Sequence, residues 1–317
     1  MTVFSLLSPR RRAAASVRPP APDAGQTREM LHAYGLLVPA IASVMFLIVY
    51  PLLRIVELSF RQGRSMNFAK ISELPLGLDN YRQVLSDPGF WNSIQVTVFY
   101  VAGSVFFAFL IGLFTALLLN ISFPGRRYLR TLILLPWAVP GVVVSIVFLW
   151  MLDGSYGVVN AILRDLGLID TDITWFVDAR TAMWAVIIPT VWKAYPLITL
   201  TLLAALQSIP SELYEASDID GASRFQRFIF ITWPGIRATA ILSAMISALW
   251  IFRDIDIIFA ATHGGPARAT ETLALYTYNE AFQYFRMGVG SAVGTMMVAV
   301  ALIGCVLSVT LIHKDKF

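Results

Sequence analysis

Long, mostly uncharged runs of apolar residues recur six times along this 317-residue chain. An α-helix rises 1.5 Å per residue, so about 20 apolar residues cross a hydrocarbon core of about 30 Å. Each run reaches that length, and the pattern predicts an all-α membrane protein with six transmembrane helices. The predicted helices cover residues 33–53, 93–120, 131–152, 182–206, 238–260 and 288–312.

The polar segments outside these helices differ in character. Residues 1–32 combine arginines, prolines and polar residues without an apolar period, so we expect a disordered basic tail ahead of one six-helix domain at 33–317. Residues 208–237 form a 30-residue connection, which is too long for a simple turn. Its pattern predicts one short helix capped by Ser211 and a second that ends before Pro234.

The distribution of basic residues predicts the orientation of the helices. An even number of spans places both termini on one side of the membrane, together with the 122–130 and 208–237 connections. These segments carry 13 Lys and Arg residues, against 9 in the segments on the opposite side. Because basic residues concentrate on the cytoplasmic side, we expect both termini and the 208–237 connection to be cytoplasmic.

Composition narrows the class of function. Hydrophobic residues make up 57% of the chain and charged residues only 14%, which excludes an ordinary soluble domain. The net charge of +4 is small and is not gathered with aromatic residues, so no nucleic-acid partner is indicated. The sequence has no metal-binding spacing, no nucleophile motif and no phosphate-binding G-x-x-x-x-G-K-[ST] loop. We therefore expect neither an enzyme nor a metal or cofactor bound by this chain.

A recognisable motif lies in the 208–237 connection. Its residues are Glu215, Ala216, Ser217, Gly221, Ile231 and Pro234. This arrangement resembles the signature loop of permease subunits of binding-protein-dependent ABC importers, where Glu-Ala-Ala, Gly and Ile-x-Leu-Pro recur at the same spacings. Ser217 stands in place of the second alanine, and Trp233 in place of the leucine. Both departures are mild, and the spacing is kept.

Three further stretches are similar to the carbohydrate-uptake branch of that family, of the maltose and glycerol-phosphate type. They are residues 77–101, 129–143 and 254–273, the last with a Thr-x-Gly-Gly-Pro segment. The resemblance implies a type I ABC importer permease architecture in a bacterial-type inner membrane. It also implies the partners: a second homologous permease, two ATPase subunits that bind ATP and Mg, and an extracytoplasmic substrate-binding protein.

The resemblance assigns coupling roles to four residues of the loop. In the family, its short helix sits in a groove on the ATPase. Glu215 would meet a basic partner there, Ala216 and Ser217 would allow close packing, and Gly221 would make the turn. An ordinary cytoplasmic hairpin that stabilises the bundle is the structural alternative.

Ionisable residues inside the predicted spans are candidates for the substrate pathway. Lys193 lies near the middle of its span, where a charge is costly by about 2.5 to 3.5 kcal/mol or more and must face protein or water. It either contacts a substrate or pairs with a carboxylate to fix the bundle. Three residues apart, Arg253 and Asp256 share a helical face and predict a structural ion pair, which leaves Asp254 as a second pathway candidate.

Aromatic residues beside these charges are weaker candidates for the same pathway. Sugar rings present flat C–H faces that aromatic rings can cover. On this basis Trp192, Tyr195 and Trp250 would contact a sugar, although aromatic residues also gather at membrane interfaces for other reasons.

The resemblance therefore implies the permease subunit of an ABC importer that moves a sugar or related polyol by alternating access. Within this class, the alternative is an anionic substrate, phosphorylated or sulfonated, with Lys193 as its countercharge. A secondary transporter driven by an ion gradient and a membrane scaffold that only anchors partners are rivals from other classes. The secondary transporter leaves the 208–237 connection unexplained, and the scaffold predicts that replacing the intramembrane charges with apolar residues leaves activity intact.

Overall fold

The computed structural model describes residues 24–63 and 73–314. The chain divides into two compact units, Met1–Leu53 and Arg54–Phe317. Of the predicted tail, residues 1–23 lie outside the described part. Helix α1 (Ala24–Val44) already covers residues 24–32, so the tail does not extend to residue 32. The reason is local, because this stretch contains good helix formers and no proline.

Within the described residues, five helices are long and apolar enough to cross a membrane. A bent pair of helices makes a sixth span if it is counted as one. The five helices cover Tyr34–Ser59, Pro88–Asn120, Ala179–Gln207, Arg224–Arg253 and Met287–Val306. The first consists of the end of α1, a π-helical turn (Met45–Val49) and α2 (Tyr50–Ser59). The predicted all-α architecture is confirmed for the described residues.

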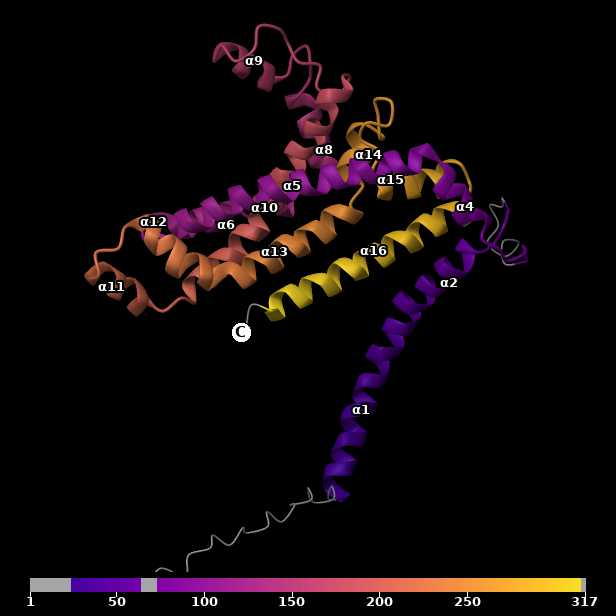
Figure 1. The fold of residues 1–317 in the computed structure, drawn as a ribbon, viewed down its shortest axis with the longest axis horizontal. Coiled ribbons are helices and arrows are strands. Elements are labelled where there is room, and N and C mark those ends of the chain that lie inside the picture. The colour runs from indigo at the N-terminus through magenta and orange to yellow at the C-terminus, as the bar shows by residue number, and fades with distance from the viewer. Residues whose placement is uncertain (1–23, 64–72, 315–317) are drawn as a thin grey trace, which may run out of the picture. The chain divides into compact units, whose positions relative to one another are not determined.

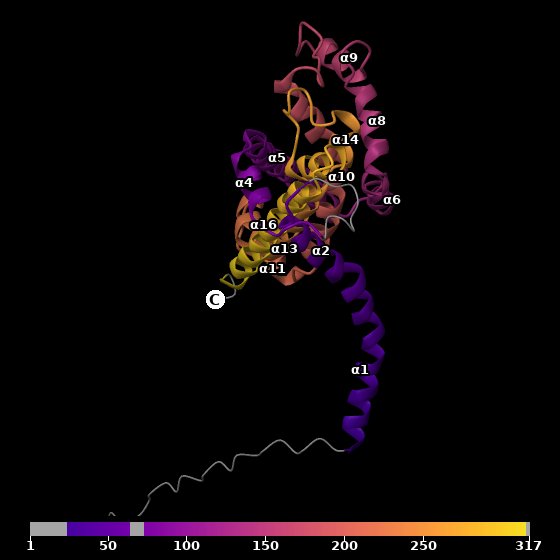
Figure 2. The same ribbon diagram turned by 90° about the vertical axis from the view of Figure 1, so that its right-hand side faces the viewer.

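The third predicted span, 131–152, is not one straight helix. It consists of α6 (Arg126–Leu132), α7 (Leu135–Ala138) and α8 (Gly141–Met151), and the chain turns by 94° between the parts before and after the break. Pro140 has no amide hydrogen and disfavours a helical residue before it. Accordingly, Val139 is extended. The short helix α9 (Val158–Asp165) follows α8 (Figure 2).

The fifth predicted span, 238–260, has different boundaries. Its helix begins in the 208–237 connection, where α12 (Arg224–Arg227), a π-helical turn (Phe228–Thr232) and α13 (Trp233–Arg253) form one continuous helix. The second loop helix therefore does not end before Pro234, which lies inside this continuous helix two residues after the π-helical turn, a common place for such an irregularity. At the other end the helix stops at Arg253, and α14 (Asp256–Ala261) starts a new one.

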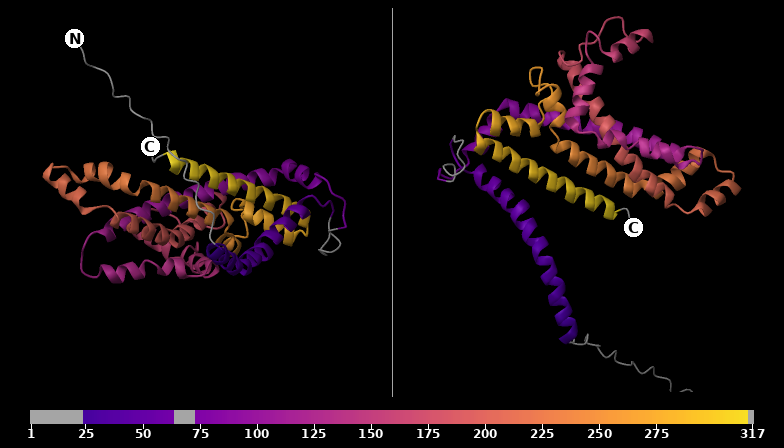
Figure 3. Two further views of the ribbon diagram at one scale, coloured as in Figure 1. Left: turned by 90° about the horizontal axis from the view of Figure 1, so that it is seen from below. Right: turned by 180° about the vertical axis from the view of Figure 1, so that it is seen from behind.

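The second unit is a helical bundle built around α10 (Ala179–Gln207). Helix α10 packs most extensively on α5 (Pro88–Asn120), and next on α13. Helix α16 (Met287–Lys314) packs on α13, on α4 (Asp79–Ser86) and on α15 (Leu273–Tyr278), which continues into a π-helical turn (Asn279–Gln283). Figures 1 and 3 show the four long helices side by side, with α11 (Ser211–Ile219) and α15 towards opposite ends.

Small residues let α5 and α10 approach closely. A Cβ atom added at Gly112 of α5 would lie 2.8 Å from the side chain of Ile198 and 3.3 Å from the backbone nitrogen of Thr199. Ala108 and Ala116, one turn away on either side, are fully buried. Close helix packing of this kind replaces the hydrophobic driving force that is absent between helices in lipid.

Gly112→Val is therefore expected to destabilise the bundle. The added side chain must push α5 away from α10, and overpacking of this kind costs about 1–3 kcal/mol. The midpoint of thermal unfolding, measured on the purified complex, should fall. Gly35→Val is the matched control, because nothing lies within 4 Å of a Cβ atom at that position. Equal midpoints for the two variants would contradict the packing argument.

Candidate functional site

The 208–237 connection folds back onto the long helix that follows it. Helix α11 starts at Ser211, but Pro210 rather than Ser211 occupies the cap position, and no side chain caps the helix. Tyr214 of α11 hydrogen bonds to Thr232 (3.0 Å between the hydroxyl oxygens). On the same side, Arg227 donates to the Asp218 carboxylate at 2.5 Å. These two contacts fix α11 against the start of the Arg224–Arg253 helix.

The four predicted coupling residues do not all face the same way. Glu215 and Ala216 are exposed, whereas Ser217 is buried and donates to the carbonyl oxygen of Tyr214 at 2.7 Å. Gly221 ends the helix with a φ of +69°, in the left-handed region that favours glycine. Ser217 therefore packs within the loop, and Glu215 and Ala216 are available to a partner.

The outer surface of α11 also carries an apolar side chain that nothing in the described chain covers. Ile219, one turn after Glu215 on the same face of the helix, is 87% exposed. Leu213, two residues before Glu215 and 50% exposed, lies on another face. An apolar surface next to the free carboxylate of Glu215 is the composition expected of a protein–protein contact.

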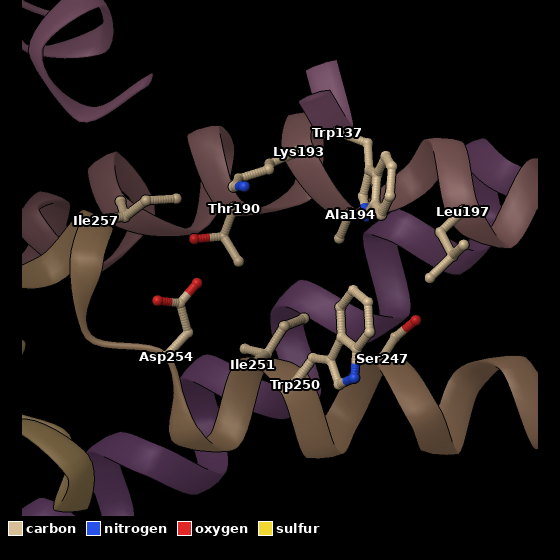
Figure 4. Close-up of a pocket in the computed structure, with 10 residues that line it drawn as sticks. All are labelled: Trp137, Thr190, Lys193, Ala194, Leu197, Ser247, Trp250, Ile251, Asp254 and Ile257. Carbon is tan, nitrogen blue, oxygen red and sulfur yellow. The ribbon is translucent and has the colours of Figure 1, made fainter. Parts of the chain in front are cut away.

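Three of the predicted pathway residues line one cavity of about 90 Å³, here called the Lys193 cavity (Figure 4). Lys193 comes from α10 and Trp250 from α13. Asp254 is the residue directly after α13. In the view of Figure 4, Thr190 lies between Lys193 and Asp254. The cavity is bordered by Trp250 and Trp137, whose side chains are 45% and 44% exposed, so it is not closed by this chain alone.

Two buried hydroxyl groups, one of which lines this cavity, are hydrogen bonded to each other. Thr190 donates to the carbonyl oxygen of Val186 at 2.8 Å, which uses its only hydroxyl proton. Tyr100 of α5 therefore donates to Thr190, with 2.8 Å between the two oxygens. Sequence reasoning did not single out Thr190, and no local signal could have, because its partner lies on another helix.

Two other predicted pathway residues belong to a different cavity. Trp192 and Tyr195 line an apolar cavity of about 620 Å³ together with Phe107, Phe148 and Trp184. The periodicity of α10 explains the separation, because Lys193 and Leu197 share one face of the helix and Trp192 and Tyr195 share another. The structure therefore does not bring these two aromatic residues to Lys193.

The predicted ion pair between Arg253 and Asp256 is wrong. Among the described residues, no ion pair joins them, because the helix breaks at Asp254, which is extended (φ −76°, ψ 131°). Asp254 instead accepts a hydrogen bond from the amide nitrogen of Asp256 at 3.0 Å. The side chain of Asp256 lies against Gly141 of α8, where an added Cβ atom would be 2.8 Å from the Cβ atom of Asp256.

Residues 108–314 match the family described as the inner membrane component of binding-protein-dependent transport systems. The chain belongs to this family. The permease therefore has the multi-pass inner-membrane location that its motif and its apolar helices predicted.

Relatives of the permease include two sugar transport proteins. It is 34% identical over 290 residues to the sulfoquinovosyl glycerol transport system permease of Agrobacterium fabrum, covering 89% of this chain and 90% of that protein. It is 37% identical over 279 residues to the trehalose/maltose transport system permease of Thermococcus litoralis, covering 87% and 91%. The predicted membership in the carbohydrate-uptake family is confirmed.

The fold of the permease is shared with a solved structure. A chain of a bacterial ABC transporter that imports the acidic polysaccharide alginate superposes with a TM-score of 0.77 at 24% identity, covering 91% of the permease and 96% of that chain. The predicted importer-type permease architecture is thereby confirmed as a fold.

Proposed function

We propose that this permease imports a neutral sugar or related polyol by alternating access. It works with a second homologous permease, two ATPase subunits and an extracytoplasmic substrate-binding protein. The ATPase subunits bind ATP and Mg, whereas this chain catalyses no reaction and holds no cofactor. The 208–237 connection and both termini are cytoplasmic in this arrangement, as the distribution of basic residues indicates.

The main support for the proposal is one continuous helix that joins the 208–237 connection to the Lys193 cavity. Helix α11, which presents Glu215, is fixed to the beginning of the Arg224–Arg253 helix. That helix ends next to Asp254, which lines the Lys193 cavity. A rigid element between two sites transmits a displacement at one end to the other, so movement of an ATPase under α11 would change the cavity.

The cavity supports a neutral substrate because it contains one charge of each sign. Lys193 donates hydrogen bonds and Asp254 accepts them, which suits hydroxyl groups. At about 90 Å³, the cavity is smaller than the roughly 300–1,000 Å³ of ligand pockets. The exposed rings of Trp137 and Trp250 mark the open side, which the second permease would close.

An anionic sugar derivative is the second candidate substrate. The permease of Agrobacterium fabrum, 34% identical to this chain, belongs to a transport system named for sulfoquinovosyl glycerol, a sulfonated compound. Lys193 would supply the countercharge for such a substrate, and Asp254 would then oppose its binding.

Reconstitution tests the proposal directly. The complex of both permeases and the ATPase subunits is placed in proteoliposomes, and ATP hydrolysis and uptake are measured with the binding protein and neutral or sulfonated sugars. We expect hydrolysis and uptake to require the sugar-loaded binding protein, and neutral sugars to compete better than anionic ones. Uptake that follows an ion gradient without ATP would contradict the proposal and favour a secondary transporter. Better competition by anionic sugars would favour the second candidate.

A further inference from the structure

A third cavity, larger than the Lys193 cavity, lies at the end of the bundle opposite the 208–237 connection. Its volume is about 400 Å³, within the roughly 300–1,000 Å³ of ligand pockets. It shares no residue with the Lys193 cavity. The walls come from the residue before α5, from the 263–271 segment and from the segment between α15 and α16.

Carboxylates held by a hydrogen-bond network shape the walls of this cavity. Glu271 is paired with Arg268 and accepts from the side-chain nitrogen of Asn279 at 2.8 Å. Asp87 accepts from the hydroxyl of Tyr276 at 2.6 Å. Burial tends to raise the pKa of Asp87, but this hydrogen bond, the Gly89 amide and the nearby arginines outweigh it and hold that pKa below its ordinary value.

The ion pair of Glu280 and Arg286 in this network has two atoms without hydrogen-bond partners among the described residues. Glu280, only 2% exposed, accepts from Arg286 Nη2 through Oε1 at 2.6 Å. Its other oxygen, Oε2, and the Nε atom of Arg286 are buried and have no hydrogen-bond partner within the described residues. Burial, against the pull of Arg286, raises the pKa of Glu280, so a donor from outside the chain would stabilise its charged form. Buried polar groups without partners are rare, so a group that both donates and accepts is expected between these two atoms.

The chemistry of these two atoms selects the occupant. Glu280 Oε2 needs a donor and Arg286 Nε needs an acceptor, and a hydroxyl group is both. The arginines of the lining disfavour a metal ion, and no cluster of metal-ligating residues occurs in the described part of the chain. The carboxylates disfavour an anion in the same way. A hydroxyl group of a neutral ligand fits both atoms, as a water molecule would in its absence.

An aromatic side chain completes the cavity at its opening. Tyr284 lines it and is 54% exposed, with the guanidinium carbon of Arg286 5.2 Å from the ring centroid. A ring held at the opening offers a flat apolar surface beside the polar groups of the interior. This combination of an apolar platform and a few fixed polar groups is typical of small-ligand sites.

We propose that this cavity is a loading site, which binds the sugar or polyol on the extracytoplasmic side before it reaches the Lys193 cavity. Glu280 and Arg286 hold one hydroxyl group, and Tyr284 covers a face of the ring. The loading site rests on the proposed import function and adds a second binding position to it.

Equilibrium binding to the complete permease–ATPase complex tests the loading site. The complex is placed in lipid nanodiscs without the binding protein, and binding of radiolabelled trehalose and maltose is measured. In Glu280→Gln, an amide nitrogen that donates can take the place of the carboxylate oxygen Oε2 that accepts from the sugar. The charged hydrogen bond is lost, so we expect binding to weaken roughly tenfold or more. Asp165→Asn, which removes an exposed carboxylate of α9, is the matched control and should bind like the unchanged complex.

Two results would overturn the loading site: no binding of either sugar to the unchanged complex, or equal binding by Glu280→Gln. If the Glu280→Gln complex does not assemble, Tyr284→Ala is tested in its place. The exposed side chain of Tyr284 lies outside the buried network, and its removal should also weaken sugar binding. ATP hydrolysis stimulated by the sugar-loaded binding protein is measured on the same samples. Stimulation without direct sugar binding removes the loading site and keeps the import function. Sugar binding that depends on Glu280, without stimulated ATP hydrolysis, keeps the loading site and removes the ATP-driven import function.

Discussion

Glu215→Lys is expected to abolish the ATP hydrolysis that the sugar-loaded binding protein stimulates. Glu215 is exposed on α11, one turn before the exposed apolar side chain of Ile219. Disrupting a charge pair at a protein contact costs about 2–5 kcal/mol, and 1.4 kcal/mol is a factor of ten. The reversed charge should therefore weaken attachment of the ATPase by about thirtyfold or more.

The effect of Glu215→Lys can be separated from misfolding. The side chain of Glu215 makes no hydrogen bond or ion pair within the described residues, so its replacement leaves the contacts of Tyr214 and Asp218 in place. Asp220→Lys is the matched control, because this exposed residue just after the same helix undergoes the same change of charge. Copurification of the ATPase subunits and stimulated hydrolysis are the measurements. Unchanged values for Glu215→Lys would remove the loop from the coupling mechanism.

Lys193→Met is expected to reduce sugar uptake about 10- to 100-fold. A hydrogen bond from a charged donor contributes about 1.5–3 kcal/mol, which corresponds to that range. Methionine keeps much of the length of the side chain and loses the three donors. Uptake into proteoliposomes, measured over a range of concentrations of the sugar-loaded binding protein, is the readout.

A double variant distinguishes a substrate contact from a structural pair. If Lys193 only balances the charge of Asp254, then Lys193→Met with Asp254→Asn removes both charges and should restore uptake. If both residues contact the sugar, the double variant should transport no better than the worse single variant. Restored uptake in the double variant would contradict the assignment of this cavity to the substrate.

Sequence reasoning located the long helices well because hydropathy is a local property. A run of apolar residues must be buried in lipid wherever its neighbours lie, so the helices around Lys193 and at 288–312 needed no tertiary information. The break at Pro140 was also visible in the sequence, since proline removes an amide hydrogen. Hydropathy alone overlooked it, because the residues on both sides are equally apolar.

The charged residues near residue 254 show where this reasoning fails. Arg253 and Asp256 share a face only if the helix continues, and the extended conformation of Asp254 ends it. Trp192 and Tyr195 are close to Lys193 in sequence but face another cavity. Proximity along the chain predicts a shared site only when the helical register agrees, and the register says nothing about which neighbouring helix closes the site.

The sequence by itself determined the class of the protein and the place of its long helices, because these depend on composition and periodicity along the chain. The family came from the resemblance of the loop that carries Glu215 to the signature loop of importer permeases. Only the tertiary structure decided which polar groups meet. Lys193 and Asp254 come from different helices, and Asp87 meets Tyr276 across most of the chain. Such contacts result from the packing of helices at small residues such as Gly112, and packing depends on all the neighbouring helices at once.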